Sequence, residues 1–316
     1  MTRRLLAQLG RAATPVLAFG IFAGLFMPPV ASALQPLLLP SIVLLLALAL
    51  LRLDWDRMGR YARRPGIVGL VVVWQLLLSP LVAFAIGSAF GLPAGLLAAL
   101  TLNAASSPIM SSAAFAQLLD LDAPLSVVVV VAGTLLLPLT VTPIAFWLVD
   151  VALPIDAAGF LARIGVFIVL PFGVAFLVRR LAGEATLDRH DDAIAGATVV
   201  TLLVFAIAVM DGVAVRLLEE PGEVLLFLAV ALAANIGFQI LSTALFWLAG
   251  RRTAASIGLM SGNRNMGLIL ALTGGIAGED FLLYLAVAQV PIYVLPLVAK
   301  PVYRRLMRGG RIEIRP

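Results

Sequence analysis

Polar residues interrupt two long apolar stretches of the chain at depths where a membrane helix is usually apolar. Their side chains are Asn103, Ser106, Ser107, Ser111 and Ser112 in the first stretch, and Ser261, Asn263, Arg264 and Asn265 in the second. Pro108 breaks the first helix because proline lacks a backbone N–H and clashes with the preceding turn. Each break creates a new helix N-terminus, whose unpaired N–H groups and positive dipole end suit an anion. The two interruptions together predict a binding site within the membrane.

Arg264 is the most unusual of these residues. It lies twelve residues from Arg252 and fifteen from Glu279, or about 18–22 Å of helix. A charge at this depth costs at least about 2.5–3.5 kcal/mol, so it should face a cavity or a partner. We expect Arg264 to hold an anionic substrate or to replace a bound cation. The alternative is an ion pair with Asp211, the one plausible deep carboxylate.

Isolated polar residues also occur in neighbouring apolar stretches. Gln75 lies in the middle of one stretch, and Ser126 lies near the start of another. A lone polar side chain in a membrane commonly hydrogen-bonds to a neighbouring helix without further function. For Ser111, Ser112, Ser126 and Thr134 taken singly, this structural role and a role in the site both stay open. The paired clusters taken together favour a site.

The composition predicts an all-α polytopic membrane protein. Of the 316 residues, 62% are hydrophobic and 12% are charged, whereas soluble domains average about 45–50% and about 25%. The apolar residues form blocks of the length that crosses a bilayer. The chain has no cysteine and one histidine, His190, in a charged segment. An enzyme with a cysteine nucleophile or a histidine–cysteine metal site is therefore disfavoured, and we expect no cofactor.

Ten membrane-spanning segments follow from the apolar blocks. Their ranges are 13–31, 36–51, 66–86, 92–119, 123–149, 158–178, 193–215, 222–249, 253–278 and 280–303. With both termini in the cytoplasm, nineteen of the 22 Lys and Arg residues fall on the cytoplasmic side, as the positive-inside rule requires. Only Arg163 and Arg216, at outer helix ends, and Arg264 do not. Because the basic residues are dispersed among these loops, we expect the lipid bilayer as partner and no nucleic acid.

The chain also carries an internal repeat. The sequence LPLTVTP at 137–143 recurs as LPLVAKP at 295–301, 158 residues later. Five helices separate the copies, so the halves, about 13–149 and 158–303, have opposite orientations. Inverted repeats of this kind are typical of secondary transporters. A cleavable signal peptide ending near 31–33 is an alternative for the first segment, but it would leave an unpaired helix, so we expect that segment to be retained.

The layout and the local sequence resemble the bile acid:sodium symporter family. The run from Gln75 to Pro80 is similar to the family's Gln-x4-Pro in its third helix. The stretch from Ser112 through Ser126 to Pro143 is similar to its fourth and fifth helices. The segment 262–268 (GNRNMGL) is similar to its Gly-x-x-Asn-x-Gly-Leu signature. The resemblance implies a panel of helices 1, 2, 6 and 7 and a core of helices 3–5 and 8–10, with the broken helices 4 and 9 crossing in the core.

The resemblance further implies transport of organic anions such as bile acids and other carboxylates. In sodium-coupled members, Gln75, Ser112 and Ser126 correspond to sodium ligands. At four other ligand positions this chain differs: Ala113 stands for Asn, Val130 for Thr, Met260 for an acidic residue and Arg264 for Gln. Sodium needs several oxygen ligands, whereas a guanidinium has only donors. We therefore expect at least one sodium site to be lost.

These observations predict a secondary transporter of a small organic anion, with doubtful sodium coupling, in a bacterial inner membrane. An ordinary sodium-coupled symporter and a passive channel on the same fold are the alternatives. An arsenite exporter of related fold is disfavoured, because such exporters rely on a membrane cysteine that this chain lacks.

Overall fold

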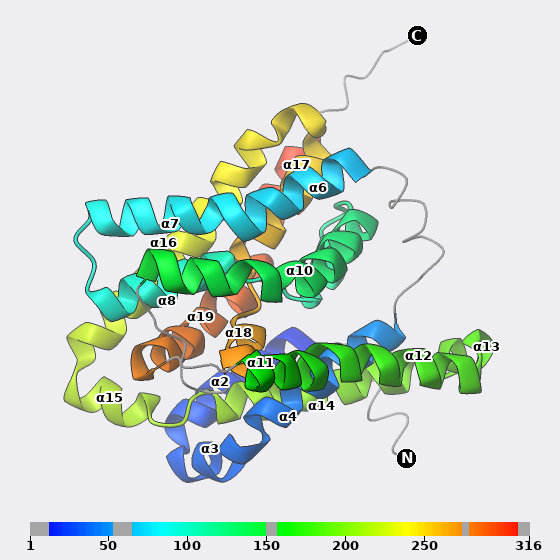
Figure 1. The fold of residues 1–316 in the computed structure, drawn as a ribbon, viewed down its shortest axis with the longest axis horizontal. Helices are drawn as coiled ribbons and strands as arrows, with labels where there is room; N and C mark the ends of the chain where they lie inside the picture. The colour runs from blue at the N-terminus through cyan, green and yellow to red at the C-terminus, as the bar shows by residue number, and fades with distance from the viewer. Residues whose placement is uncertain (1–12, 53–64, 150–156, 274–277, 309–316) are drawn as a thin grey trace.

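Helices make up almost all of the described structure, a computed structural model that describes residues 13–52, 65–149, 157–273 and 278–308 (Figure 1). Seven helical stretches in these ranges are long and apolar enough to cross a membrane. They are Pro28–Leu51, Pro65–Ala89, Ala123–Val149, Ala162–Ala182, Asp191–Glu219, Pro221–Leu245 and Gly278–Pro296. With this fold and these spans, the chain is an all-α polytopic membrane protein.

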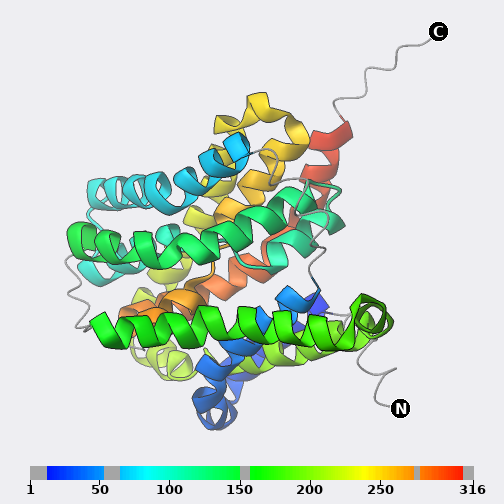
Figure 2. The same cartoon turned by 45° about the vertical axis from the view of Figure 1, so that its right-hand side comes forward.

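The helices form two groups, which lie one above the other in Figures 1 and 2. The lower group, called the panel group here, consists of α2 (Ala13–Phe26), α3 (Pro28–Leu34), α4 (Leu38–Leu51), α11 (Ala157–Ile164), α12 (Leu170–Ala182) and α14 (Asp191–Ala208). The upper group, called the core group, consists of α6 (Pro65–Val73), α7 (Ser79–Ala89), α8 (Ala94–Ala105), α9 (Ser111–Leu118), α10 (Ala123–Val149), α16 (Pro221–Leu245), α17 (Arg251–Gly262), α18 (Met266–Thr273) and α19 (Glu279–Val298). Shorter elements are η1 (Gln35–Leu37), α13 (Glu184–Arg189), α15 (Val213–Glu219), η4 (Trp247–Ala249) and α20 (Lys300–Arg308).

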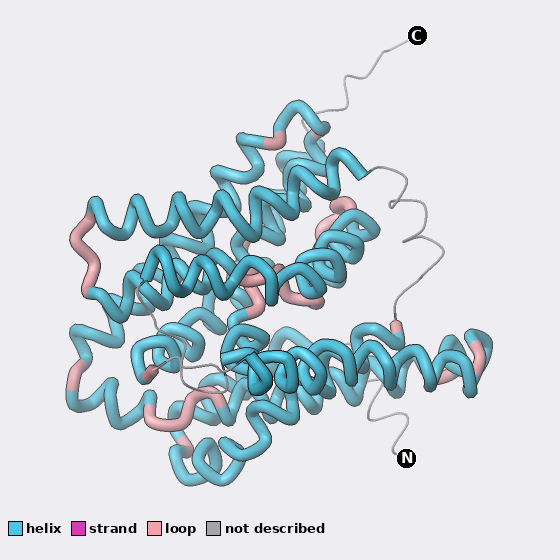
Figure 3. Tube along the Cα trace, in the orientation of Figure 1, coloured by secondary structure: helices cyan, strands magenta, loops and turns pink. Residues whose placement is uncertain are grey.

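Both predicted helix breaks are confirmed. The first separates α8 from α9 over residues 106–110, and the second separates α17 from α18 over residues 263–265. Figure 3 shows the loop segments that interrupt these helices in the interior of the molecule. Because each piece is shorter than a membrane span, neither broken helix counts among the seven spans. The total of ten spans and the inverted repeat stay predictions.

Three predicted segments differ in detail from the observed helices, although 193–215 lies within the single stretch Asp191–Glu219. The segment 13–31 runs through Met27, where the chain leaves the helix and Pro28 and Pro29 begin α3, since proline is favoured in a first helical turn. The segment 193–215 is interrupted after α14 by a turn with Gly212 at a φ of 77°, a conformation that glycine adopts without strain. The segment 280–303 ends early, because α19 stops at Val298 and α20 begins at Lys300.

Two spans contain a wide, π-helical turn that is followed by a proline. The turn η2 (Trp74–Leu78) joins α6 to α7, and η3 (Gly165–Val169) joins α11 to α12. In η2 the N–H of Ser79 bonds to the carbonyl of Trp74. The carbonyl of Gln75 would next need the N–H of residue 80, but that residue is proline and has none. The Gln75 carbonyl therefore has no backbone donor; it accepts from the Ser79 hydroxyl at 2.8 Å and keeps a lone pair for another donor.

Candidate functional site

The two helix breaks pair with each other. Pro108 and Arg264 form an isolated antiparallel bridge. The N–H of Ile109 donates to the carbonyl of Asn263 at 3.0 Å, and the N–H of Asn265 donates to the carbonyl of Ser107 at 2.8 Å. Backbone polar groups away from water need partners within the protein. The crossing supplies these partners, so two unwound segments can persist at membrane depth.

Side chains from neighbouring helices brace the crossing. In the second break, Asn235 of α16 donates through Nδ2 to the carbonyl of Gly262 at 2.7 Å and to Oδ1 of Asn263 at 3.3 Å. In the first break, the Ser106 hydroxyl donates to the carbonyl of Asn103 at 2.7 Å. The hydroxyls of Ser107 and Thr134 lie 3.3 Å apart. Sequence reasoning missed Asn235, although a lone Asn in the apolar stretch 222–249 was an available signal.

Arg264 is buried, with 2% of its surface exposed, and its guanidinium hydrogen-bonds to oxygen atoms of three helical spans. These contacts are Nε to the Ser261 carbonyl at 2.8 Å, Nη1 to the Gln75 carbonyl at 3.1 Å and the Ser106 carbonyl at 2.9 Å, Nη1 to Gln75 Oε1 at 3.5 Å, and Nη2 to the Ser79 hydroxyl at 2.9 Å. The side chain thus has the acceptors that a buried guanidinium requires. Ser79 is a second residue that sequence reasoning did not select.

The acceptors around Arg264 are free because the local backbone releases them. Ser106 ends α8, and Ser261 lies in the last turn of α17, where helix carbonyls lack intrahelical partners. The Gln75 carbonyl is released by Pro80, as described above. Helix C-termini also carry a partial negative charge that favours a cation. The guanidinium therefore occupies a site that the two helix ends and the π-helical turn make attractive to a positive charge.

The alternative pairing of Arg264 with Asp211 is wrong. Asp211 is exposed, in the turn that follows α14. The contacts described for the guanidinium go to carbonyl, amide and hydroxyl oxygens and to none of the carboxylates in the described part of the chain. Arg264 is a buried cation held by neutral acceptors.

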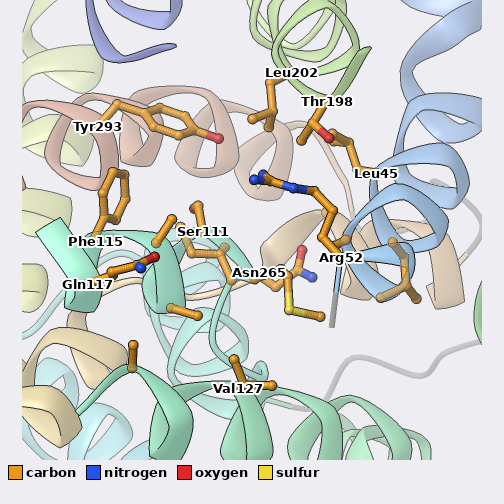
Figure 4. Close-up of a pocket in the computed structure, with 18 of the residues that line it drawn as sticks. Leu45, Arg52, Ser111, Phe115, Gln117, Val127, Thr198, Leu202, Asn265 and Tyr293 are labelled. Atoms are coloured by element: carbon orange, nitrogen blue, oxygen red, sulfur yellow. The ribbon is translucent and has the colours of Figure 1, made fainter. Parts of the chain in front are cut away.

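A cavity of about 660 Å³ lies between the panel group and the core group (Figure 4). From the panel group, α4 and α14 line it, and from the core group α9, α18 and α19 do so. Its polar side chains include Thr198, Ser111, Asn265, Gln289 and Tyr293. The exposed residues Arg52, Asp120 and Arg252 line its mouth, on the side that the sequence predicts to be cytoplasmic.

The N-terminal ends of the second half-helices border this cavity. α9 begins at Ser111 and α18 begins at Met266, and both residues line it together with Asn265. Their positive dipole ends are suited to an anion, while the N–H groups of Ser112, Ala113 and Leu268 in these first turns already donate to nearby oxygens of the chain. Arg264 contributes to the cavity wall, but its guanidinium is hydrogen-bonded to buried oxygens at the C-terminal ends of α8 and α17 and in the span that contains η2. The crossing therefore has two faces: one, toward the cavity, presents helix N-termini that suit an anion, and the other presents helix C-termini that hold a cation.

Ser112 on α9 and Ser126 on α10, together called the second polar cluster here, lie on two helices that pack against each other. Both are fully buried. The Ser126 hydroxyl donates to the carbonyl of Asp122 at 3.1 Å, whereas the Ser112 hydroxyl has no hydrogen-bond partner. Val130 and Met260, where the resemblance implies a threonine and an acidic sodium ligand, are buried apolar side chains. This donor set does not fit the oxygen coordination that a hard cation requires.

The predicted site residues thus fall into separate places. Arg264, Gln75, Ser106 and Ser261 meet around the guanidinium; Ser111 and Asn265 face the cavity; Ser107, Asn103 and Asn263 support the crossing; Ser112 and Ser126 lie in the second cluster. The guanidinium and the cavity lie on different faces of the crossing, which sequence spacing alone does not show.

Comparison with known proteins gives one family. The model of the Sodium Bile acid symporter family matches residues 39–220, more than half of the chain. The match begins in α4, includes the first helix break and ends just before α16. A comparison with curated proteins found no match.

Proposed function

Because the chain belongs to the Sodium Bile acid symporter family, a family of membrane transporters, we propose that it is a secondary transporter of a small organic anion bearing a carboxylate. In this proposal the substrate binds in the cavity at the crossing, and Arg264 supplies permanently a charge that sodium supplies elsewhere. The observation that carries the proposal is the two-faced crossing. Its N-terminal helix ends face the cavity, and its C-terminal ends hold a guanidinium.

The cavity supports a small anionic substrate. Its volume of about 660 Å³ lies within the range of about 300–1,000 Å³ for small-molecule sites. A carboxylate placed against the starts of α9 and α18 faces two positive helix-dipole ends. Ser111 and Asn265 are positioned there to add side-chain hydrogen bonds. The apolar side chains of α4 and α14 on the panel side suit the rest of an organic anion.

Arg264 supports transport without sodium at its position. A guanidinium within hydrogen-bond distance of the Gln75 and Ser106 carbonyls occupies the oxygens that a sodium ion would use. Two positive charges at one place repel each other strongly where water is excluded. The fixed charge also balances the helix C-termini at all stages of transport. We therefore propose that neither substrate binding nor the fold depends on sodium.

Alternating access follows from the position of the cavity. It lies between the panel and core groups and is lined by exposed residues at one end. In this proposal the core group rocks against the panel group and exposes the crossing first to one side of the membrane and then to the other. The positively charged residues at the described mouth, Arg52 and Arg252, support a cytoplasmic position for it in this proposal, in line with the positive-inside rule.

The test measures the thermal stability of the purified full chain in sodium, potassium and choline salts, with a panel of carboxylates. A ligand at a hundred times its dissociation constant stabilises the folded state by about 2.7 kcal/mol. We expect one class of carboxylate to stabilise the protein equally in all three salts. Asn265→Leu, which removes a cavity-lining amide, should abolish this shift. A sodium-specific shift would instead support the sodium-coupled alternative, and stabilisation by none of the carboxylates would overturn the proposal.

Transport itself distinguishes a carrier from a channel. In proteoliposomes loaded with unlabelled substrate, a carrier accumulates labelled substrate transiently by counterflow, and a passive channel does not. We expect counterflow with the carboxylate that the stability test identifies. Its absence alongside measurable flux would favour the channel.

A further inference from the structure

Arg216 lies at the junction of the panel and core groups, on a helix that contacts both α2 and α16. It lies on α15, which follows α14 of the panel group. Its Nε and Nη2 donate to the two carboxylate oxygens of Glu223 on α16 at 2.7 and 2.9 Å, and Nη2 also donates to Oδ1 of Asp280 on α19 at 2.9 Å. The bond to Glu223 spans a short turn, whereas the bond to Asp280 joins residues 64 positions apart. A single guanidinium therefore connects three helices.

Asp280 is held from its other side as well. A methyl group at Gly95, in the first turn of α8, would lie 1.6 Å from Oδ2 of Asp280. The carboxylate thus packs directly against the start of a core helix, where the positive dipole end stabilises it. Only glycine leaves room for this approach. Asp280 is fixed between Arg216 and α8, so its position depends on both.

These contacts lie at the end of the molecule away from the cavity mouth. The sequence places Arg216 at an outer helix end, whereas Arg52 and Arg252 line the mouth. A second contact between the groups, from Nη1 of Arg163 on α11 to the carbonyl of Leu272 on α18 at 3.5 Å, also involves an outer arginine. By contrast, Arg52 pairs with Asp191 inside the panel group. Panel and core are thus tied together at the outer end and separated by a cavity at the other.

We propose that Arg216, Glu223 and Asp280 form the outer gate of the transporter, an ion-pair lock that holds the cytoplasm-facing state and opens when the cavity turns outward. This inference rests on the alternating access proposed above. The three side chains are 23%, 30% and 40% exposed. Water reaches them, so the lock opens without leaving a charge in an apolar interior, and its free energy stays small enough to be reversible.

The test uses the absence of native cysteine from the chain. Thr198→Cys places one thiol on α14 in the cavity wall, and its reaction with a membrane-impermeant maleimide, added to the cytoplasmic side of vesicles, reports how often the cavity faces that side. In this background we expect Arg216→Gln to slow labelling at least threefold, because the lock no longer holds the cytoplasm-facing state. Asp280→Asn, and Gly95→Ala through displacement of Asp280, should act in the same direction.

Arg179→Gln is the matched control. It also removes an arginine–glutamate pair, but its partner Glu184 lies beside the panel group, so labelling should stay at the rate of the parent. Equal labelling of the parent, Arg216→Gln and Asp280→Asn, with folding verified by unchanged thermal unfolding, would overturn the gate. If Arg216→Gln does not fold, the labelling rate of Asp280→Asn alone tests the gate. Because labelling is measured without substrate, it is independent of the carboxylate test and separates a failure of the gate from a failure of the proposed function.

Discussion

The two buried polar clusters of the core group differ in how their oxygens are used. Around Arg264, three carbonyls, an amide oxygen and a hydroxyl accept hydrogen bonds from a single guanidinium. Around Ser112, the hydroxyl is buried without a partner beside a helix whose Ser126 bonds only to its own backbone. The resemblance to the family places sodium ligands in both. One cluster contains its own cation, and the other contains neither a charge nor a complete set of ligands.

The difference shows what a buried charge requires. A guanidinium in a membrane interior is stable only when the surrounding structure holds several hydrogen-bond acceptors in place around it. Here Pro80 frees one carbonyl, and the two helix breaks free two others. The Ser112 cluster has helical backbone on both sides, so its carbonyls are already paired. The buried charge, Arg264, therefore lies where backbone carbonyls have no helical partner and can accept its hydrogen bonds.

The largest expected effect comes from Arg264→Gln, which removes the charge but keeps an amide of the kind that the family uses. We expect the free energy of unfolding in potassium salt to fall by about 3–5 kcal/mol, because several buried oxygens lose their donor at once and each unsatisfied buried group costs about 1–3 kcal/mol. We also expect sodium to recover part of this loss, because the vacated oxygens suit a hard cation. Denaturant unfolding in detergent, in matched sodium and potassium salts, measures both.

Arg264→Lys is the control for charge. It keeps the positive charge but loses the planar fork that reaches Ser79 and Ser106 at once, so its stability should lie between those of the wild type and Arg264→Gln, with no response to sodium. A wild-type protein that responds to sodium as strongly as Arg264→Gln would contradict the proposal that Arg264 permanently supplies the charge that sodium supplies elsewhere.

A feature of the site can be predicted from the sequence when the residues that produce it are close together in the chain. The breaks at Pro108 and between Gly262 and Gly267 were predictable, because the residues that disrupt a helix lie in the break itself. The partners of Arg264 were not, because Ser79 lies 185 positions away and becomes a partner only when the helices pack. Asn235 was missed for the same reason, since a lone amide in an apolar helix reads as an ordinary interhelical contact until its acceptor is known.

The interruption after α14 shows that even a local feature can be missed when the residue that causes it is common in continuous helices. The apolar run from 193 to 215 predicts one helix, yet a turn at Gly212 redirects the chain into α15. A single glycine is tolerated in many membrane helices, so its presence did not decide the matter. The turn places Arg216 against two core helices, a consequence that hydropathy does not reveal.

Ser79→Ala sharpens the comparison, because it removes one acceptor of the guanidinium, together with the bonds that the hydroxyl donates to the carbonyls of Gln75 and Ala104, and leaves the charge in place. The hydroxyl receives a bond from Nη2 of Arg264 at 2.9 Å, and hydrogen bonds to charged groups contribute about 1.5–3 kcal/mol. We expect a loss of stability of that size. Ser41→Ala is the matched control, because that buried serine bonds only to a carbonyl in its own helical span and should cost about 1 kcal/mol or less. Equal losses for the two variants would show that the guanidinium does not depend on Ser79.

Gly262→Ala tests how firmly the second break is positioned. A methyl group there would lie 2.7 Å from the backbone carbonyl of Asn235, which cannot move away as a flexible side chain can. We expect a loss of about 1–3 kcal/mol, typical of overpacking, with a loss of transport because the crossing shifts. At Gly133, beside the first break, a methyl group would lie 3.3 Å from the Ser107 side chain. Gly133→Ala should therefore cost less, and the reverse order would mean that the first break is the more rigid one.

The smallest effect, and one of opposite sign, is expected from Ser112→Ala. A buried hydroxyl without a partner is destabilising, so its removal should leave stability unchanged or raise it by up to about 1 kcal/mol. The response to sodium should stay absent, because Val130 and Met260 already deny the cluster a threonine oxygen and a carboxylate. Denaturant unfolding of Ser112→Ala measures this effect. Ser126→Ala is the control, because the Ser126 hydroxyl of the wild type has a partner, the Asp122 carbonyl, and its removal breaks that bond. If Ser112→Ala instead loses more than about 1 kcal/mol, and does so only in sodium salt, its hydroxyl binds a sodium ion, and the two clusters would differ in the identity of their cation and not in its presence.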